Sequence, residues 1–387
     1  MRGILLMALT TFMCVAGARP NFVKIAPLMN ELRRHADVRP FLVHTGQHYD
    51  REMSHLFFEQ LNIPRPDVNL EVGSASPATQ LATIIQRFER VLIDQKPALV
   101  IVVGDVTSTL ACTLTAVGQG IPVAHVEAGL RSFDRTMPEE INRILTDAVS
   151  DFLFTTERSA SENLRREGID AARIHFVGNV MIDSLLAHRQ RAACSDVLAR
   201  LGLAPQSYAL VTLHRPSNVD ERPTLEGILS ALSAISRHLP VIFPSHPRTR
   251  TNIEAFDLGH YVVSRNGDAA AEGINLYGPF GYLDFLQLMA EASVVLTDSG
   301  GIQEETTVLG TPCVTIRENT ERPVTIEQGT NILAGRCPER IVDACALAVT
   351  GRRGVRRIPE LWDGRAAERI SQILVGAFTR ELCASSC

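Results

Sequence analysis

The chain has 387 residues, 45% of them hydrophobic and 21% charged, a composition that excludes extensive disorder and a single small module. This length predicts two domains, each with its own buried core. Thirty-eight basic and 43 acidic residues give a net charge of -5, so the sequence offers no global attraction for nucleic acid or an anionic membrane. Any anionic ligand must therefore be held by a local group of residues.

The eight cysteines show neither a C-x-x-C pair nor the spacing of zinc ligands. Several lie inside apolar runs, where a cysteine is typically a small core residue. We therefore expect no metal site, and a reducing compartment, the cytoplasm.

Residues 1–18 combine one arginine, an apolar stretch and a small-residue ending, features shared with a secretory signal. The stretch runs directly into a helix-forming segment from Arg19, and a signal cleavage here would remove the strand that this segment needs. We therefore expect a strand near residues 11–17. No other apolar stretch reaches the roughly 18 to 20 residues of a transmembrane helix, so no membrane segment is expected.

Short apolar runs alternate with amphipathic segments, the pattern of βα units that build parallel sheets covered by helices. The fold class is α/β, with two Rossmann-like lobes that face a central cleft. Strands are expected near residues 11–17, 40–45, 98–103, 121–127, 152–155, 173–177, 208–213, 240–244, 274–278, 293–298 and 312–316. The expected domains are a first lobe over 1–178, a second lobe over 179–365, and a terminal helix within 366–387 that can pack back on the first lobe.

Polar residues end many of these apolar runs, at the edge where open parallel sheets bind their ligands. In the first lobe these residues are Arg19, Asp105, His125 and Glu127, and in the second they are His214, Arg215, His246, Arg248, Asp298 and Ser299. If the two lobes face each other, these side chains converge on one cleft.

Each of these residues also has a structural interpretation. Asp105 fits an N-cap of the following helix, and Glu139 belongs to a Pro-Glu-Glu sequence typical of a helix first turn. His214 and His246 could be satisfied core histidines. Glu127 ends a strand that should be buried and has no capping role, which favours a functional carboxylate.

Residues 294–310 read VVLTDSGGIQEETTVLG, a strand followed by a glycine turn and a helix. Backbone N–H groups and the positive helix end at residues 299–301 suit a phosphate. The motif is neither a Walker A sequence nor G-x-G-x-x-G, so neither ATP nor a nicotinamide cofactor is indicated. Glu305 could accept hydrogen bonds from ribose hydroxyls or merely complement the helix dipole, and Arg322 in the next loop could add charge-assisted bonds to the phosphates.

In nine ordered stretches the sequence resembles the non-hydrolysing UDP-N-acetylglucosamine 2-epimerases, whose fold is similar to that of GT-B glycosyltransferases. The stretches are GARPNFVKIAPL, HTGQHYD, VVGDVTSTLA, VAHVEAGLRS, MPEEINRILTD, VGNVMIDSL, LHRPSNVD, LTDSGGIQEE and ENTERPVT. Together they extend over nearly the whole chain. The resemblance implies a UDP-sugar substrate, no cofactor and a homodimer.

The resemblance also implies roles for individual residues. Catalytic or near-catalytic roles fall on Asp105, Glu127, Glu139 and His214. The resemblance implies diphosphate or sugar contacts for Arg19, Lys24 and Arg143, and phosphate contacts for Ser299, Gly300 and Gly301. It implies a ribose contact for Glu305, a uracil contact for Phe285 and a further site contact for Arg322. We add His246 to the substrate-binding residues from its place at a strand end.

Two departures from the family pattern leave questions open. Residues 17–24 read GARPNFVK where many members read G-T-R-P-E-A-I-K, and a sister group that acts on a diacetamido uronic acid nucleotide also begins G-A-R-P. Residues 47–50 read QHYD where bacterial members often carry a Q-H-R-like segment beside an activating substrate molecule. The exact sugar and allosteric activation by substrate are therefore undecided.

The expected reaction is reversible C2 epimerisation of UDP-N-acetylglucosamine to UDP-N-acetylmannosamine. The C2 hydrogen is next to no carbonyl, so UDP must leave C1 first; loss of the proton then gives 2-acetamidoglucal. Proton return on the opposite face requires groups on two sides of the ring, although the base cannot be assigned. The alternatives are a diacetamido uronic acid 2-epimerase, a hydrolysing epimerase, a GT-B glycosyltransferase and a non-catalytic UDP-sugar sensor.

Overall fold

The computed structural model describes residues 9–46, 61, 63, 65–73, 75–269, 272–351 and 357–384, apart from the side chains of residues 19 and 379–384. The chain forms two compact units, Met1–Ser184 with Glu360–Cys387, and Leu185–Pro359. The sequence predicts domain divisions after residues 178 and 365, whereas the units divide after residues 184 and 359. The terminal helix α16 (Ala366–Ala384) is part of the first unit.

The first unit is built on a parallel seven-stranded sheet with the order β3-β2-β1-β4-β5-β6-β7. Its strands are β1 (Thr10–Ala16), β2 (Val38–His44), β3 (Val68–Asn69), β4 (Leu99–Val103), β5 (Val123–Ala128), β6 (Phe152–Thr155) and β7 (Ile174–Phe176). Its helices include α1 (Arg19–Leu32), α3 (Pro77–Gln95), α4 (Thr107–Gly118), α5 (Pro138–Val149) and α6 (Arg158–Arg166), while α7 (Val180–Ala192) crosses the division between the units. The strand order reverses between β1 and β4, the place where doubly wound sheets bind ligands.

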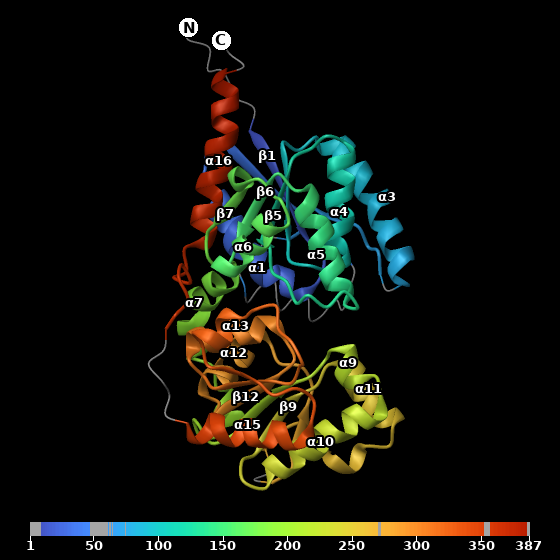
Figure 1. Cartoon of the computed structure of the whole chain (residues 1–387), viewed down its shortest axis with the longest axis vertical. Helices are drawn as coiled ribbons and strands as arrows, with labels where there is room; N and C mark the ends of the chain where they lie inside the picture. Colours follow the sequence, from blue (N-terminus) through green and yellow to red (C-terminus); the bar gives the residue numbers. More distant parts are fainter. Residues whose placement is uncertain are drawn as a thin grey trace. The chain divides into compact units, whose positions relative to one another are not determined.

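Alternation along β1 directs its side chains to two helical layers. Met13 and Val15 pack in a core cluster with Phe88 of α3 and with residues of α4. Phe12 points to the other face, where its ring lies 5.2 Å from that of Phe378 in α16. Figure 1 shows α16 and the α3–α4 pair on opposite sides of the first unit. Both faces of β1 are therefore buried, as its apolar sequence requires.

The second unit has a parallel seven-stranded sheet with the order β10-β11-β9-β8-β12-β13-β14. Its strands are β8 (Ala209–Thr212), β9 (Val241–Pro244), β10 (Val262–Ser264), β11 (Ile274–Tyr277), β12 (Val294–Thr297), β13 (Cys313–Thr315) and β14 (Asn331–Leu333). Its helices are α8 (Val197–Arg200), α9 (Pro216–Val219), α10 (Arg222–Ser236), α11 (Pro247–Ala255), α12 (Tyr282–Glu291), α13 (Gly300–Leu309), α14 (Val324–Glu327) and α15 (Pro338–Thr350). Residues of α10 and α15 share a core cluster with the central strands.

The predicted α/β class with two Rossmann-like sheets is confirmed. Every strand expected from the sequence is present, whereas β3, β10 and β14 were not predicted. Within the described residues, no helix combines the length and the hydropathy that crossing a membrane requires.

Candidate functional site

In the first unit the predicted site residues follow three adjacent strands, β1, β4 and β5. Lys24 of α1 forms an ion pair with Glu127, and both side chains are less than 10% exposed. Glu127 has a positive φ of 74°, at a register shift between Val126 and Ala128 in β5. Such a backbone conformation is uncommon for a residue with a side chain and is concentrated at functional sites.

Gly104 brings the turn after β4 directly against this ion pair. A Cβ atom at position 104 would lie 3.2 Å from Oε2 of Glu127 and 3.4 Å from Nζ of Lys24, and φ is +71°. Only glycine fits without strain, because the conformation is left-handed and the space is taken. Asp105, the next residue, is thereby held beside the Lys24–Glu127 pair.

Asp105 accepts a 3.0 Å hydrogen bond from Nε of Arg143, whose guanidinium is 1% exposed. The Asp105 side chain is 27% exposed, so the Asp105 side of this ion pair is accessible to solvent. The N-cap of α4 is Val106, so Asp105 lies one residue before the N-cap position of this helix.

Glu140, which the sequence did not single out, anchors the loop before α5. Its buried carboxylate accepts hydrogen bonds from the backbone N–H groups of Ser132 (2.9 Å) and Phe133 (3.0 Å) and pairs with Arg143. Glu139 lies beside it in the first turn of α5 and is half-buried. Among the described residues, the Glu139 carboxylate makes no hydrogen bond and no ion pair, and its place in the first turn of α5 also fits the helix-dipole interpretation.

Arg19 begins α1 directly after β1, as expected, but its side chain lies outside the description. Residues 47–50, the QHYD segment, also lie outside the described residues. The first unit thus brings together Lys24, Asp105, Glu127 and Arg143, with Glu139 one helical turn before Arg143 on α5.

In the second unit the predicted phosphate turn has the expected form. Ser299 is the N-cap of α13, and the helix ends at Gly310 in the left-handed conformation. Arg322 lies close above Gly300, since a Cβ there would come within 2.7 Å of its Cζ. The Arg322 guanidinium is buried, and it pairs with Glu304 at 2.7 Å and with Glu321.

Glu321 forms ion pairs with three arginines. It pairs with Arg317 at 2.7 Å and with Arg215 at 3.4 Å as well as with Arg322. Burial lowers the pKa of Arg317, although Glu321 opposes this shift. The cluster therefore gathers three guanidinium groups near the start of α13, and guanidinium groups form charge-assisted hydrogen bonds to phosphates.

Glu305, the predicted ribose contact, is buried. Burial and the neighbouring Glu304 raise the pKa of Glu305 to about 8, so its carboxyl group is largely protonated at neutral pH. The hydroxyl of Tyr282 donates to it at 3.5 Å. Phe285, the predicted uracil contact, is half-buried one turn further along α12.

His214 and His246 are both exposed at strand ends, which excludes core roles for their rings. The rings lie 6.3 Å apart between centroids, and Nδ1 of His214 is 2.9 Å from Oδ1 of Asp298. Burial alone would raise the pKa of Asp298, but His214 and two backbone N–H groups together lower it. His246 is also the N-cap of α11, where Nδ1 accepts the N–H of Arg248.

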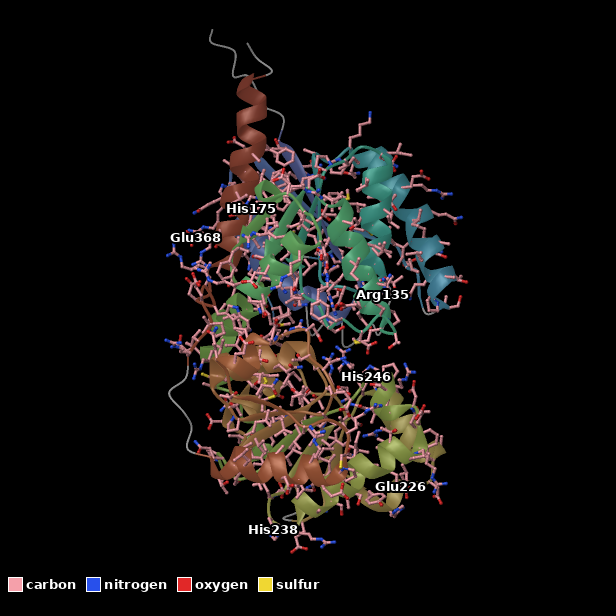
Figure 2. All side chains as sticks on the ribbon, viewed as in Figure 1. Arg135, His175, Glu226, His238, His246 and Glu368 are labelled. Atoms are coloured by element: carbon pink, nitrogen blue, oxygen red, sulfur yellow. The ribbon has the colours of Figure 1, made fainter. Side chains whose placement is uncertain are left out.

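Figure 2 shows His246 and His238 at opposite ends of the second unit. His246 follows β9 and His238 precedes it, so His246 marks the carboxyl edge of this sheet. His214 and the start of α13 follow the adjacent strands β8 and β12 at the same edge. Within the described residues, no group of three or more histidine, cysteine or acidic side chains is arranged to hold a metal ion.

The family model for UDP-N-acetylglucosamine 2-epimerase matches residues 30–375. The chain belongs to the UDP-N-acetylglucosamine 2-epimerase family. It is therefore an isomerase, and the family resemblance expected from the sequence is confirmed.

Relatives within the epimerase family cover almost the full length of the chain. The UDP-N-acetylglucosamine 2-epimerase of Methanococcus maripaludis is 39% identical over 94% of this chain and 97% of its own. The UDP-2,3-diacetamido-2,3-dideoxy-D-glucuronate 2-epimerase of Pseudomonas aeruginosa is 40% identical over 93% of this chain and 98% of its own. The solved UDP-GlcNAc 2-epimerase of Methanocaldococcus jannaschii, in complex with UDP-GlcNAc and UDP, is 40% identical with a TM-score of 0.88, covering 95% and 99% of the two chains.

This solved 2-epimerase shares the GT-B-like fold expected from the sequence. Sequence reasoning missed several polar residues near the candidate site residues: the buried Asn21, Arg131, Glu140, Asp147, Glu304, Arg317 and Glu321, and the partly buried Asn142. Most lie in helices or loops, away from strand ends, where a charged residue normally indicates an exposed face. Only the ordered motifs that surround them, such as MPEEINRILTD, offered a signal.

Proposed function

We propose that the protein catalyses reversible C2 epimerisation of UDP-N-acetylglucosamine to UDP-N-acetylmannosamine. The observation that carries this proposal is the position of Asp105 and Glu127 at adjacent strand ends, each with a buried cation. Epimerisation needs several proton-transfer groups in one place, whereas transfer of a sugar to an acceptor does not explain so many carboxylates in the first unit.

The second unit is proposed to hold UDP. Ser299, Gly300 and Gly301 would contact the diphosphate through backbone N–H groups at the helix start, and Arg322 would add charge-assisted bonds. Glu305 would contact the ribose and Phe285 the uracil. His214 and His246, on adjacent strand ends, complete this set.

In the first unit, Asp105, Glu127 and Glu139 are proposed to transfer protons at C2 after UDP leaves C1. Lys24 forms an ion pair with Glu127, and Arg143 forms one with Asp105, so each of these two carboxylates has a buried cationic partner. Arg19, with Lys24 and Arg143, would stabilise the departing diphosphate electrostatically. The 2-acetamidoglucal formed in this way would then be protonated on the opposite face while UDP returns to C1.

Incubation with UDP-N-acetylglucosamine, and separately with the diacetamido uronic acid nucleotide, tests the proposed substrate. We expect UDP-N-acetylmannosamine from the first nucleotide and slower conversion of the second, with both products followed by proton NMR. Preferred conversion of the uronic acid nucleotide would favour the sister activity, and release of free N-acetylmannosamine would show a hydrolysing enzyme.

We also propose that the protein is a cytoplasmic homodimer. Apolar side chains are exposed on the neighbouring helices α3, α4 and α5 of the first unit: Ile93 (56% exposed), Leu114 (40%), Val117 (38%) and Leu145 (44%). A second copy of the chain would cover them. A cytoplasmic location is supported by the cysteine pattern, which favours a reducing compartment.

Leu114→Glu is expected to weaken this dimer, because it places a charge at the centre of the exposed apolar residues. Sedimentation equilibrium should give a higher dissociation constant for this variant than for the wild type. Leu347→Glu is the control, since Leu347 is 62% exposed on α15 of the second unit. A wild-type protein that sediments as a monomer would contradict the dimer.

A further inference from the structure

Three successive backbone carbonyls, from the last residue of β4 to Asp105, each accept a hydrogen bond from a polar side chain. Asn21 donates from Nδ2 to Val103 O at 2.9 Å, His125 lies 2.8 Å from Gly104 O through Nε2, and Asn142 donates from Nδ2 to Asp105 O at 2.8 Å. The donors belong to α1, β5 and α5. The turn that presents Asp105 is therefore held from three separate elements.

The central donor, His125, is fully buried with both ring nitrogens directed at acceptors. Nδ1 lies 2.6 Å from Oδ1 of Asp147, and Nε2 faces the carbonyl of Gly104. The ring therefore links the turn after β4 to Asp147 of α5.

Asp147, the partner of this ring, is held by further contacts. Its second oxygen lies 2.7 Å from Arg131 and accepts the N–H of Gly129 at 3.1 Å. Burial would raise the pKa of Asp147, but His125 and Arg131 lower it, so the group stays ionised. The His125 ring is thus fixed in place by a carboxylate that Arg131 and Gly129 hold through its second oxygen.

The turn held in this way determines the positions of two carboxylates. Gly104 lies against the Lys24–Glu127 pair, and Asp105 is the following residue. We propose that Asn21, His125 and Asn142 are positioning residues that set the location of Asp105 relative to Glu127, an inference that rests on the proposed proton-transfer role of Asp105. A shift of about 1 Å in such a group can lower a rate by as much as 10²-fold.

Asn142 offers the cleanest test, because it is only partly buried and donates to Asp105 itself. Asn142→Ala is expected to lower kcat by about 10-fold or more while KM and the affinity for UDP stay unchanged. Asn252→Ala is the matched control, since Asn252 makes the same kind of bond, at 2.8 Å, to Val219 O in the second unit. The control variant should keep the wild-type kcat.

A double-mutant cycle separates positioning from a general structural role. If Asn142 acts through Asp105, then adding Asn142→Ala to Asp105→Asn lowers kcat no further. An equal loss in both backgrounds, or a wild-type kcat in the single variant, would overturn the proposal. A fully active Asp105→Asn variant would instead refute the proposed function of Asp105, which keeps the two failures distinguishable.

Discussion

Replacement of Asp105, Glu127 or Glu139 by the corresponding amide is expected to lower turnover by about 10²-fold or more, because each variant removes a group proposed to transfer a proton. Binding of UDP should persist, since none of the three carboxylates is a proposed UDP contact and the proposed ribose, uracil and helix-start phosphate contacts lie in the second unit. Turnover is followed by NMR of the nucleotide sugars and UDP affinity by calorimetric titration.

The three variants should differ in stability. Glu127→Gln leaves the buried Lys24 without its counter-charge, which typically costs about 3 to 5 kcal/mol, whereas Glu139 makes no bond among the described residues and its amide should fold normally. Turnover is therefore compared per mole of folded protein. Near-normal turnover in the amide variants would contradict the proposed proton transfer and would show that these carboxylates have only structural roles.

Asp151→Asn is the matched control for these carboxylates. Asp151 accepts the N–H of Val123 at 2.8 Å, at the amino end of β5, opposite the edge that carries Glu127. The amide oxygen can still accept this bond, so turnover should stay close to that of the wild type. A similar loss in this control would show that carboxylate-to-amide changes act through the fold.

Gly300→Val is expected to weaken UDP binding by about 10²-fold or more, which a calorimetric titration measures. A Cβ at this position would come within 2.7 Å of Cζ of Arg322 and of Oε1 of Glu321, so the valine must displace both side chains. It would also block approach of a phosphate to the backbone. Because Arg322 is buried and paired with Glu304, the variant should also lose thermal stability.

Gly259→Val controls for the loss of a glycine in the same unit. Position 259 has open space around its Cβ direction and needs no positive φ, so UDP affinity should not change. If Gly300→Val binds UDP as tightly as wild type, the assignment of residues 299–301 to the phosphates is wrong.

Long apolar runs made the central strands predictable from the sequence. β4 and β5 are buried on both faces, so their side chains form nearly continuous apolar stretches. The three strands that were missed are short and lie at sheet edges: β3 has two residues, and β10 and β14 have three each. Segments this short carry no hydrophobic period, and the sheet beside them decides their conformation.

Residues at strand ends were the predictable part of the candidate site, because topology places them on one edge of a parallel sheet. The carboxylate of Asp105 bonds to Arg143, which comes 38 positions later, and the N-cap of α4 is Val106. Asn21 and Asn142 act on backbone carbonyls of residues far away in the sequence. Local patterns contain no information about such contacts.

The most direct test of the proposed mechanism is the reaction of wild-type protein with UDP-N-acetylglucosamine in heavy water, followed by proton NMR and mass spectrometry. If UDP leaves C1 before the C2 proton is lost, deuterium should enter C2 of both the epimer and the recovered starting nucleotide sugar, because protonation from exchanged acids occurs on either face. An epimer that forms with its original C2 hydrogen fully retained would contradict the elimination and re-addition route.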